Sequence, residues 1–154
     1  MNKKCSGIIV LLLLVIAGGV YKFIFQGSTS GSADGRIAIV LDAGERDLVL
    51  AEMRQFLESV QKITTGIAGD DMELVAEYAR KSGKAATVGM PGTLMGKLPL
   101  GFKKLGPDTH KQFDQLALDA EEFGDAGHAL SQLSVLLQNC VGCHAAYRFN
   151  ISNE

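Results

Sequence analysis

Residues 140–149 read CVGCHAAYRF and continue an apolar run that begins after Asp125. Cys140 and Cys143 are two of only three cysteines in the chain, and His144 directly follows the second of them. Residues three apart lie on the same face of a helix, so both thiols would project from one side. The run also repeats apolar residues at three- and four-residue steps, which predicts an amphipathic last helix, through Leu130, Leu133, Leu136 and Leu137.

The pattern Cys-x-x-Cys-His is the attachment pattern of c-type haem. Two thiols on one helix face can form thioethers with the two vinyl groups at one edge of a porphyrin, and the next residue can place its imidazole on the iron. The sequence therefore predicts one covalently attached haem c on Cys140 and Cys143, with His144 as the proximal iron ligand.

Two other chemistries use the same residue types. A zinc site needs a fourth ligand, but Cys5 lies before the N-terminal apolar run and His128 would be about 18 Å from Cys140 along the same helix. A thioredoxin-like dithiol needs a βαβ context, which the pattern does not offer. Haem attachment is the favoured interpretation.

Upstream of this motif the periodicity is helical. One helix is predicted over 43–67 after a capping box at Asp42, and a second over 72–82. A third is expected to be capped by Asp108 and to end near Gly124, and a fourth follows from Asp125. Four amphipathic helices with mostly short connections predict an all-α protein, an antiparallel four-helix bundle.

Two segments do not fit a plain bundle. The connection 84–107 is long and apolar, so we expect one or two short helices in it between Pro91 and Gly106, folded against the bundle. Residues 36–41, RIAIVL, could form a strand, but no partner strand is evident in the rest of the chain. We therefore predict an extended apolar lead-in that packs on the bundle.

The N-terminal segment 8–25 is apolar over 18 residues, and as a helix it would be about 27 Å long, enough to cross a bilayer. Lys3 and Lys4 precede it, which predicts a cytoplasmic N-terminus and an exported remainder. YKFIFQ at 21–26 separates it from the nearest small residues, which favours an uncleaved anchor over a removed signal peptide. The predicted division is 1–26 anchor or signal peptide, 27–41 Gly/Ser-rich tether and lead-in, and 42–154 haem domain.

After Gln26 the chain carries a net charge of about −5, and no basic run suggests nucleic acid. The expected location is the periplasmic side of the inner membrane, or the soluble periplasm if the N-terminal segment is cleaved. Three lysines, Lys97, Lys103 and Lys104, form a small basic cluster. It could be a solvated face or, more weakly, a docking patch for an acidic redox partner.

With CxxCH on the last of four helices, followed by AAYR, residues 42–149 resemble cytochrome c-prime and its low-spin relatives, the class II c-type cytochromes. The residues MRQ at 53–55, on the first predicted helix, resemble the same family more weakly. The resemblance implies the same haem attachment, Arg148 near a haem propionate, Tyr147 packed on the haem, and a distal iron position on the first helix of the bundle. Relatives of this kind are often dimers, so a homodimer is one option.

The residue on the other side of the iron decides the function. A methionine there gives a six-coordinate haem suited to electron transfer, whereas an apolar residue leaves an open site for gases. Met53 is the preferred sixth ligand, because it lies about three turns into the first bundle helix on its apolar stripe. Aligning MRQ with the family instead brings Leu57 or Glu58 nearer to the distal position. The other candidates are Met90 and Met95, then Met72, with His110 and His128 expected to be solvated or capping residues near helix starts.

The resulting expectation is a membrane-tethered periplasmic cytochrome, not an enzyme, that passes single electrons between membrane or periplasmic redox proteins. The alternative is a five-coordinate haem protein that binds nitric oxide or carbon monoxide as carrier or sensor. A haem peroxidase ranks last, because Arg54 and Glu58 lie near the suspected distal position but no histidine does.

Overall fold

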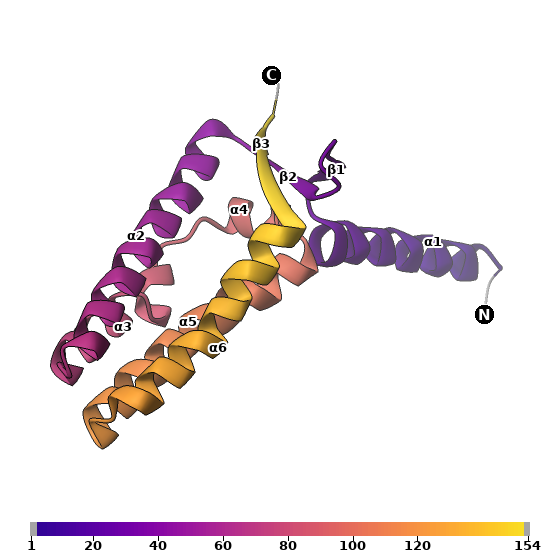
Figure 1. Ribbon diagram of the computed structural model, residues 1–154. Helices are drawn as coiled ribbons and strands as arrows, with labels where there is room; N and C mark the ends of the chain where they lie inside the picture. The colour runs from indigo at the N-terminus through magenta and orange to yellow at the C-terminus, as the bar shows by residue number, and fades with distance from the viewer. Residues whose placement is uncertain (1–2, 153–154) are drawn as a thin grey trace.

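The computed structural model describes residues 3–152, with side chains from Ser6 onward. The side chains of Lys3, Lys4 and Cys5, on which part of the N-terminal prediction rests, lie outside that range. The protein is mostly helical with one small sheet (Figure 1). The helices are α1 (Lys3–Val20), η1 (Tyr21–Gln26), α2 (Ala43–Ala68), α3 (Met72–Lys81), η2 (Lys84–Thr87), α4 (Gly92–Lys97), α5 (Leu100–Phe123) and α6 (Ala126–Ala146). The strands are β1 (Thr29–Gly31), β2 (Ile37–Leu41) and β3 (Tyr147–Ile151).

Helix α1 and the π-helical turn η1 form one apolar segment that projects away from the other helices (Figure 1). The stretch Ser6–Gln26 is long and apolar enough to cross a membrane, and none of it is buried inside the protein. An apolar surface of this size in water is unfavourable. The segment therefore has the properties of a membrane anchor or a signal sequence.

The end of this apolar segment is held firmly on α4 and α5. Lys103 Nζ donates to the carbonyl oxygen of Phe23 at 2.6 Å, and Ser28 N donates to that of Lys97 at 2.7 Å. Gly27 has φ 66° and lies so close to the backbone of Lys97 and Leu98 that a Cβ would overlap it. Within the predicted tether and lead-in 27–41, Gly27 and Ser28 thus lie against the end of α4, and residues 29–31 and 37–41 form strands.

The predicted all-α fold is incomplete, because a three-stranded sheet in the order β1-β2-β3 is present. The lead-in 36–41 does have strand partners: β2 pairs antiparallel with β1 and parallel with β3, where Ile37 lies opposite Tyr147 and Leu41 opposite Ile151. The last helix thus ends at Ala146, and the chain turns into a strand. The prediction that this segment packs against the helices is confirmed, since Ile39 and Leu41 are fully buried.

The first and last predicted bundle helices are confirmed. Helix α2 starts after Asp42, whose backbone N–H donates to the Glu45 carboxylate at 3.1 Å. Helix α6 starts after Asp125, whose carboxylate accepts from the backbone N–H of His128 at 2.7 Å. Gly124, with φ 61°, ends the helix before it.

The predicted start of the third helix is wrong. Helix α5 begins at Leu100, directly after the expected short helix α4, and runs through Pro107 and Asp108. Proline lacks the N–H that would bond four residues back, and its ring disfavours a helical residue before it. Gly106 has no Cβ that could clash with the ring of Pro107. Thr109, His110 and the later buried residues of α5 lie on one stripe of the helix. Their packing stabilises the helical conformation on both sides of the proline.

Four helices share one apolar core. Its fully buried centre includes Ile63 of α2, Val75 of α3, Phe113 of α5 and Leu136 of α6. Phe56 of α2 stacks on Phe113 with ring centroids 5.4 Å apart. This core holds the middle of α6 in place, and Cys140 packs against its edge.

A second apolar cluster lies at the other end of α2, under the sheet. Its buried members are Ile39, Leu41, Val49, Leu94 and Leu98. Met53, Met90, Phe102, Tyr147 and Phe149 pack against it. The cluster joins the start of α2, α4 and the end of the chain. Tyr147 and Phe149, which follow CVGCH, therefore pack in the same cluster as the N-terminal half of α2.

Candidate haem-attachment site

Cys140 and Cys143 lie three residues apart on α6, and both are half-buried free thiols. Asn139, which directly precedes Cys140, links this turn of α6 to α5. Its Nδ2 donates to Asp108 at 2.8 Å and to Thr109 Oγ1 at 3.3 Å. Asp108 is thus not a helix cap, as predicted, but a link between α5 and the motif. Its donors hold the pKa of this carboxyl below its ordinary value.

Both thiols are kept protonated. Burial raises the pKa of Cys140, and burial together with the nearby Cys140 raises the pKa of Cys143 to about 11. Cysteines of thioredoxin-like dithiols have the opposite property, a lowered pKa that makes the thiolate available near neutral pH. The surroundings therefore disfavour a thioredoxin-like dithiol.

His144 lies in the last turn of α6 with an exposed side chain. Its backbone is held by a residue that the sequence did not single out: Arg36 Nη1 donates to the carbonyl oxygens of His144 and Tyr147, each at 3.4 Å. The same guanidinium pairs with Asp34 at 2.6 Å. The β1–β2 hairpin thus clamps the end of the helix that carries CVGCH.

Arg148, expected near a haem propionate, lies in β3 beside the same hairpin. Its Nη1 donates to Ser32 Oγ at 3.2 Å and lies 3.6 Å from Asp34 Oδ2. Its Nε is buried and has no hydrogen-bond partner among the described residues. An unpaired buried donor is unfavourable, so this side chain retains capacity for a further acceptor.

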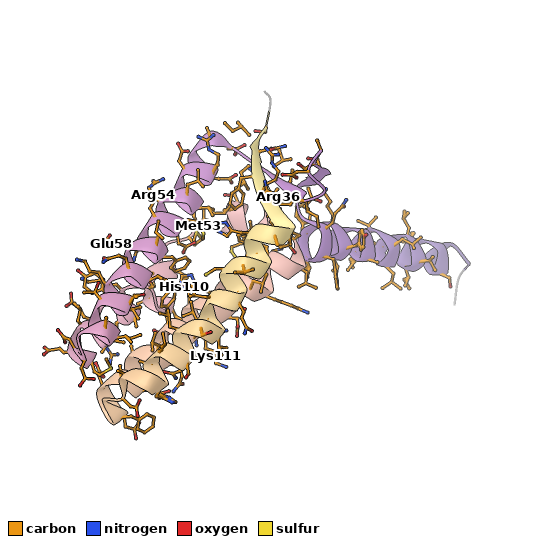
Figure 2. The ribbon with its side chains drawn as sticks, in the orientation of Figure 1. Arg36, Met53, Arg54, Glu58, His110 and Lys111 are labelled. Atoms are coloured by element: carbon orange, nitrogen blue, oxygen red, sulfur yellow. The ribbon has the colours of Figure 1, made fainter. Side chains whose placement is uncertain are left out.

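Met53 lies on the side of α2 that faces the other helices, whereas Arg54 and Glu58 lie on its outer side (Figure 2). Leu57 is 71% exposed. The distal positions that the family alignment suggested, Leu57 and Glu58, therefore point away from the interior. Met53 shares the second apolar cluster with Tyr147, three residues after His144, so it lies at the same end of the fold as the motif.

The structure separates the other candidate ligands. Met72 and His128 lie at the opposite end of the core, near the α5–α6 connection: Met72 beside Gly124, and His128 with its ring against Phe123. Neither can face an iron beside Cys140. Met90 packs in the same cluster as Met53, so Met53 and Met90 remain the best placed of the methionines.

The expectation for His110 is wrong. Because α5 starts early, His110 lies in the interior of the helix and is only 4% exposed. Its Nδ1 donates to the Ser82 carbonyl at 2.8 Å, and its Nε2 lies 3.3 Å from Glu52 Oε1 of α2. Its ring tilts against Phe56. Both ring nitrogens face acceptors, which favours the doubly protonated imidazolium.

This pairing predicts a pH-dependent contribution to stability. Burial lowers the pKa of His110, but the Glu52 and Ser82 acceptors outweigh it and raise the pKa above 6.5. A raised pKa stabilises the fold fully below about pH 6.5, and the contribution is lost as the pH rises through the folded-state value. We expect wild type to exceed Glu52→Gln in urea-unfolding free energy most near pH 6, with the gap shrinking toward about pH 8.5. A gap that stays constant over this range would refute the pairing.

The predicted basic cluster is partly neutralised. Lys97 Nζ pairs with Asp42 at 2.8 Å and with Glu45 at 2.7 Å, across the start of α2. Lys103 reaches the carbonyl of Phe23 instead of solvent. Only Lys104 of the three is exposed without such a partner among the described residues, which leaves little of a docking patch.

The residues around CVGCH fit a covalently held haem. Cys140 and Cys143 are each only partly buried and His144 is exposed, so all three side chains can be reached from outside α6. Helix α2 packs on α3 far more extensively than on α6, which leaves α2 and α6 loosely joined. Among the described side chains, no group of three or more His, Cys, Asp and Glu could hold a metal ion.

Comparisons with known protein families, with characterised proteins and with solved structures found no match. The site is therefore interpreted from its own residues. Sequence reasoning missed Arg36, Glu52 and the burial of His110. Only the pairing of β2 with β3 and the early start of α5 bring these residues into place, and no local pattern signals either.

Proposed function

We propose that the protein is a membrane-tethered monohaem c-type cytochrome that transfers single electrons on the periplasmic side of the inner membrane. In this proposal α2, α3, α5 and α6 form an antiparallel four-helix bundle of the cytochrome c-prime type. The haem is attached to Cys140 and Cys143, with His144 and Met53 on the iron. Membrane or periplasmic redox proteins are its partners, and it has no substrate that it converts.

One observation carries the proposal: two half-buried thiols lie three residues apart on α6, immediately before a histidine with an exposed side chain. Thioether formation with the two vinyl groups of a haem would consume both thiols. Hydrogen bonds join the end of the apolar segment to Lys97 of α4 and Lys103 of α5. With that segment in a membrane, they would hold this site close to the membrane surface.

The bound haem would supply a one-electron couple at its iron. The chain's own residues would do the rest. Asn139 and Asp108 hold the cysteine turn on α5, and Arg36 holds the backbone of His144. Arg148, with its unpaired Nε, is suited to a carboxylate of a propionate.

Met53 is the residue that separates electron transfer from gas binding. We expect a low-spin optical spectrum for the purified protein and no change on adding carbon monoxide to the reduced form. Met53→Leu keeps an apolar side chain of similar volume but removes the thioether sulfur. It should give a high-spin spectrum that changes with carbon monoxide.

Met72→Leu is the matched control, because Met72 lies at the opposite end of the core. Its spectrum should equal that of wild type. If wild type itself is high-spin and binds carbon monoxide, the protein is the gas-binding alternative. If Met53→Leu leaves a low-spin spectrum unchanged, Met53 is not the sixth ligand and Met90, in the same cluster, becomes the next to replace.

A further inference from the structure

A cavity of about 430 Å³ lies between α2, η2, α4 and α5. Much of its wall is apolar, with Met90, Met95, Leu98 and Phe102. Its volume falls within the range of small-molecule sites, which are mainly apolar and carry a few polar groups that orient the ligand. Neither thiol of CVGCH lines it, and neither does Met53, the proposed sixth ligand; of the two best-placed methionines only Met90 does.

The polar groups of this cavity are of both signs. The Glu52–His110 pair lies in its wall, and the rim carries Lys84 and Lys103. The Glu52–His110 pair has no net charge when His110 is protonated, so the two lysines leave the wall net positive and disfavour a cationic head group. The wall therefore suits a largely apolar ring whose oxygens can accept from a lysine at the rim.

The cavity also adjoins the apolar segment. Lys103 lines it and at the same time donates to the carbonyl of Phe23, inside the stretch long enough to cross a membrane. The ring of Phe23 comes within 3.9 Å of the position that a Cβ on Gly96 of α4 would take. With this stretch in a bilayer, the cavity lies at the level of the membrane surface, where an amphipathic lipid-soluble molecule can enter.

From the wall chemistry and this position we propose that the cavity binds the head group of a membrane quinone or quinol. A quinone ring is planar, neutral and apolar, and carries two oxygens at opposite ends. Met95 and Phe102 supply apolar contact for the ring, and Lys84 and the Glu52–His110 pair supply the polar contacts. The proposal goes beyond the electron-transfer function and does not require the haem, so each can fail separately.

Photolabelling of the full-length protein in phosphatidylcholine nanodiscs tests this site. The probe is a short-tailed benzoquinone that carries an aryl azide, and labelled peptides are identified by mass spectrometry after digestion. We expect labels within residues 84–110. An excess of decyl-benzoquinone should suppress them about tenfold, whereas decanol at the same concentration should not. Equal suppression by decanol would show a site for acyl chains, and labels confined to α1 would show partition into lipid; either result overturns the proposal.

Two variants fill the cavity from different walls: Met95→Trp on α4 and Thr87→Trp on η2. Val88→Trp is the matched control, because Val88 lies next to Thr87 but is exposed and does not line the cavity. Circular dichroism shows which variants keep the fold. A folded filling variant should lose labelling about tenfold while Val88→Trp keeps it. Undiminished labelling in a folded filling variant would contradict the proposal, as would loss of labelling in Val88→Trp.

Discussion

Replacing both Cys140 and Cys143 by serine should abolish covalent haem attachment. When the wild type is produced together with a c-type haem attachment machinery, we expect each chain to gain the mass of one haem, retained after denaturation. The double variant should gain none, because a hydroxyl does not form the thioether with a vinyl group. Intact-protein mass spectrometry reads out both results directly.

Cys5→Ser provides the control, since Cys5 is the third cysteine of the chain and lies at its other end. It should retain the full haem mass. A wild type without added mass, under conditions that load a known c-type cytochrome, would refute haem attachment. A haem mass that persists in the double variant would show that these thiols do not hold it.

Replacing Phe113 by alanine should have the largest effect on the free energy of unfolding. Phe113 is 0% exposed, stacks on Phe56 and stands at the centre of the core that four helices share. Losing a buried phenyl ring costs about 3–5 kcal/mol, because apolar burial is lost and the cavity closes only in part. Urea unfolding of the full chain in mild detergent, followed by circular dichroism, measures this loss.

Phe123→Ala is the matched substitution on the same helix. Phe123 is 57% exposed at the end of α5, so its loss should change the unfolding free energy by no more than about 0.5 kcal/mol. Similar costs for the two substitutions would mean that the shared core is not organised around Phe113. A small loss of unfolding free energy in Phe113→Ala would mean that the centre of the core does not lie at Phe113.

The helices were predictable where local signals agree with tertiary packing. Helix α2 shows both a capping box at Asp42 and apolar residues at helical spacing, and Gly124 and Asp125 mark the α5–α6 junction by backbone conformation and capping. The start of α5 was misplaced because Gly106, Pro107 and Asp108 imitate the start of a helix. The buried stripe that overrides them becomes visible only once its neighbours are in place.

The sheet could not be predicted for a different reason. The β2 strand pairs with β3, about 110 residues later in the chain, and a parallel pairing over that separation leaves no local pattern. Nothing in the residues after CVGCH marks them as a strand, so the sequence shows no partner for RIAIVL.

The candidate site also contains residues that the sequence predicts and residues that only the tertiary structure brings together. Cys140, Cys143 and His144 were found because the chemistry fixes their spacing within one turn of a helix. Met53 followed from helical periodicity, and the structure places it inward at the same end as the motif. Arg36 and the Glu52–His110 pair depend on the clamp by the β1–β2 hairpin and on the true start of α5, so they required tertiary structure.

A potentiometric titration of the full-length protein, followed by its visible absorption spectrum, tests the central claim most directly. We predict a single reversible transition of a haem spectrum with one electron per chain, a slope of about 59 mV for each tenfold change in the ratio of oxidised to reduced protein. Carbon monoxide should not alter the reduced spectrum. The absence of a redox-active visible chromophore would contradict the account, as would a reduced spectrum that carbon monoxide changes.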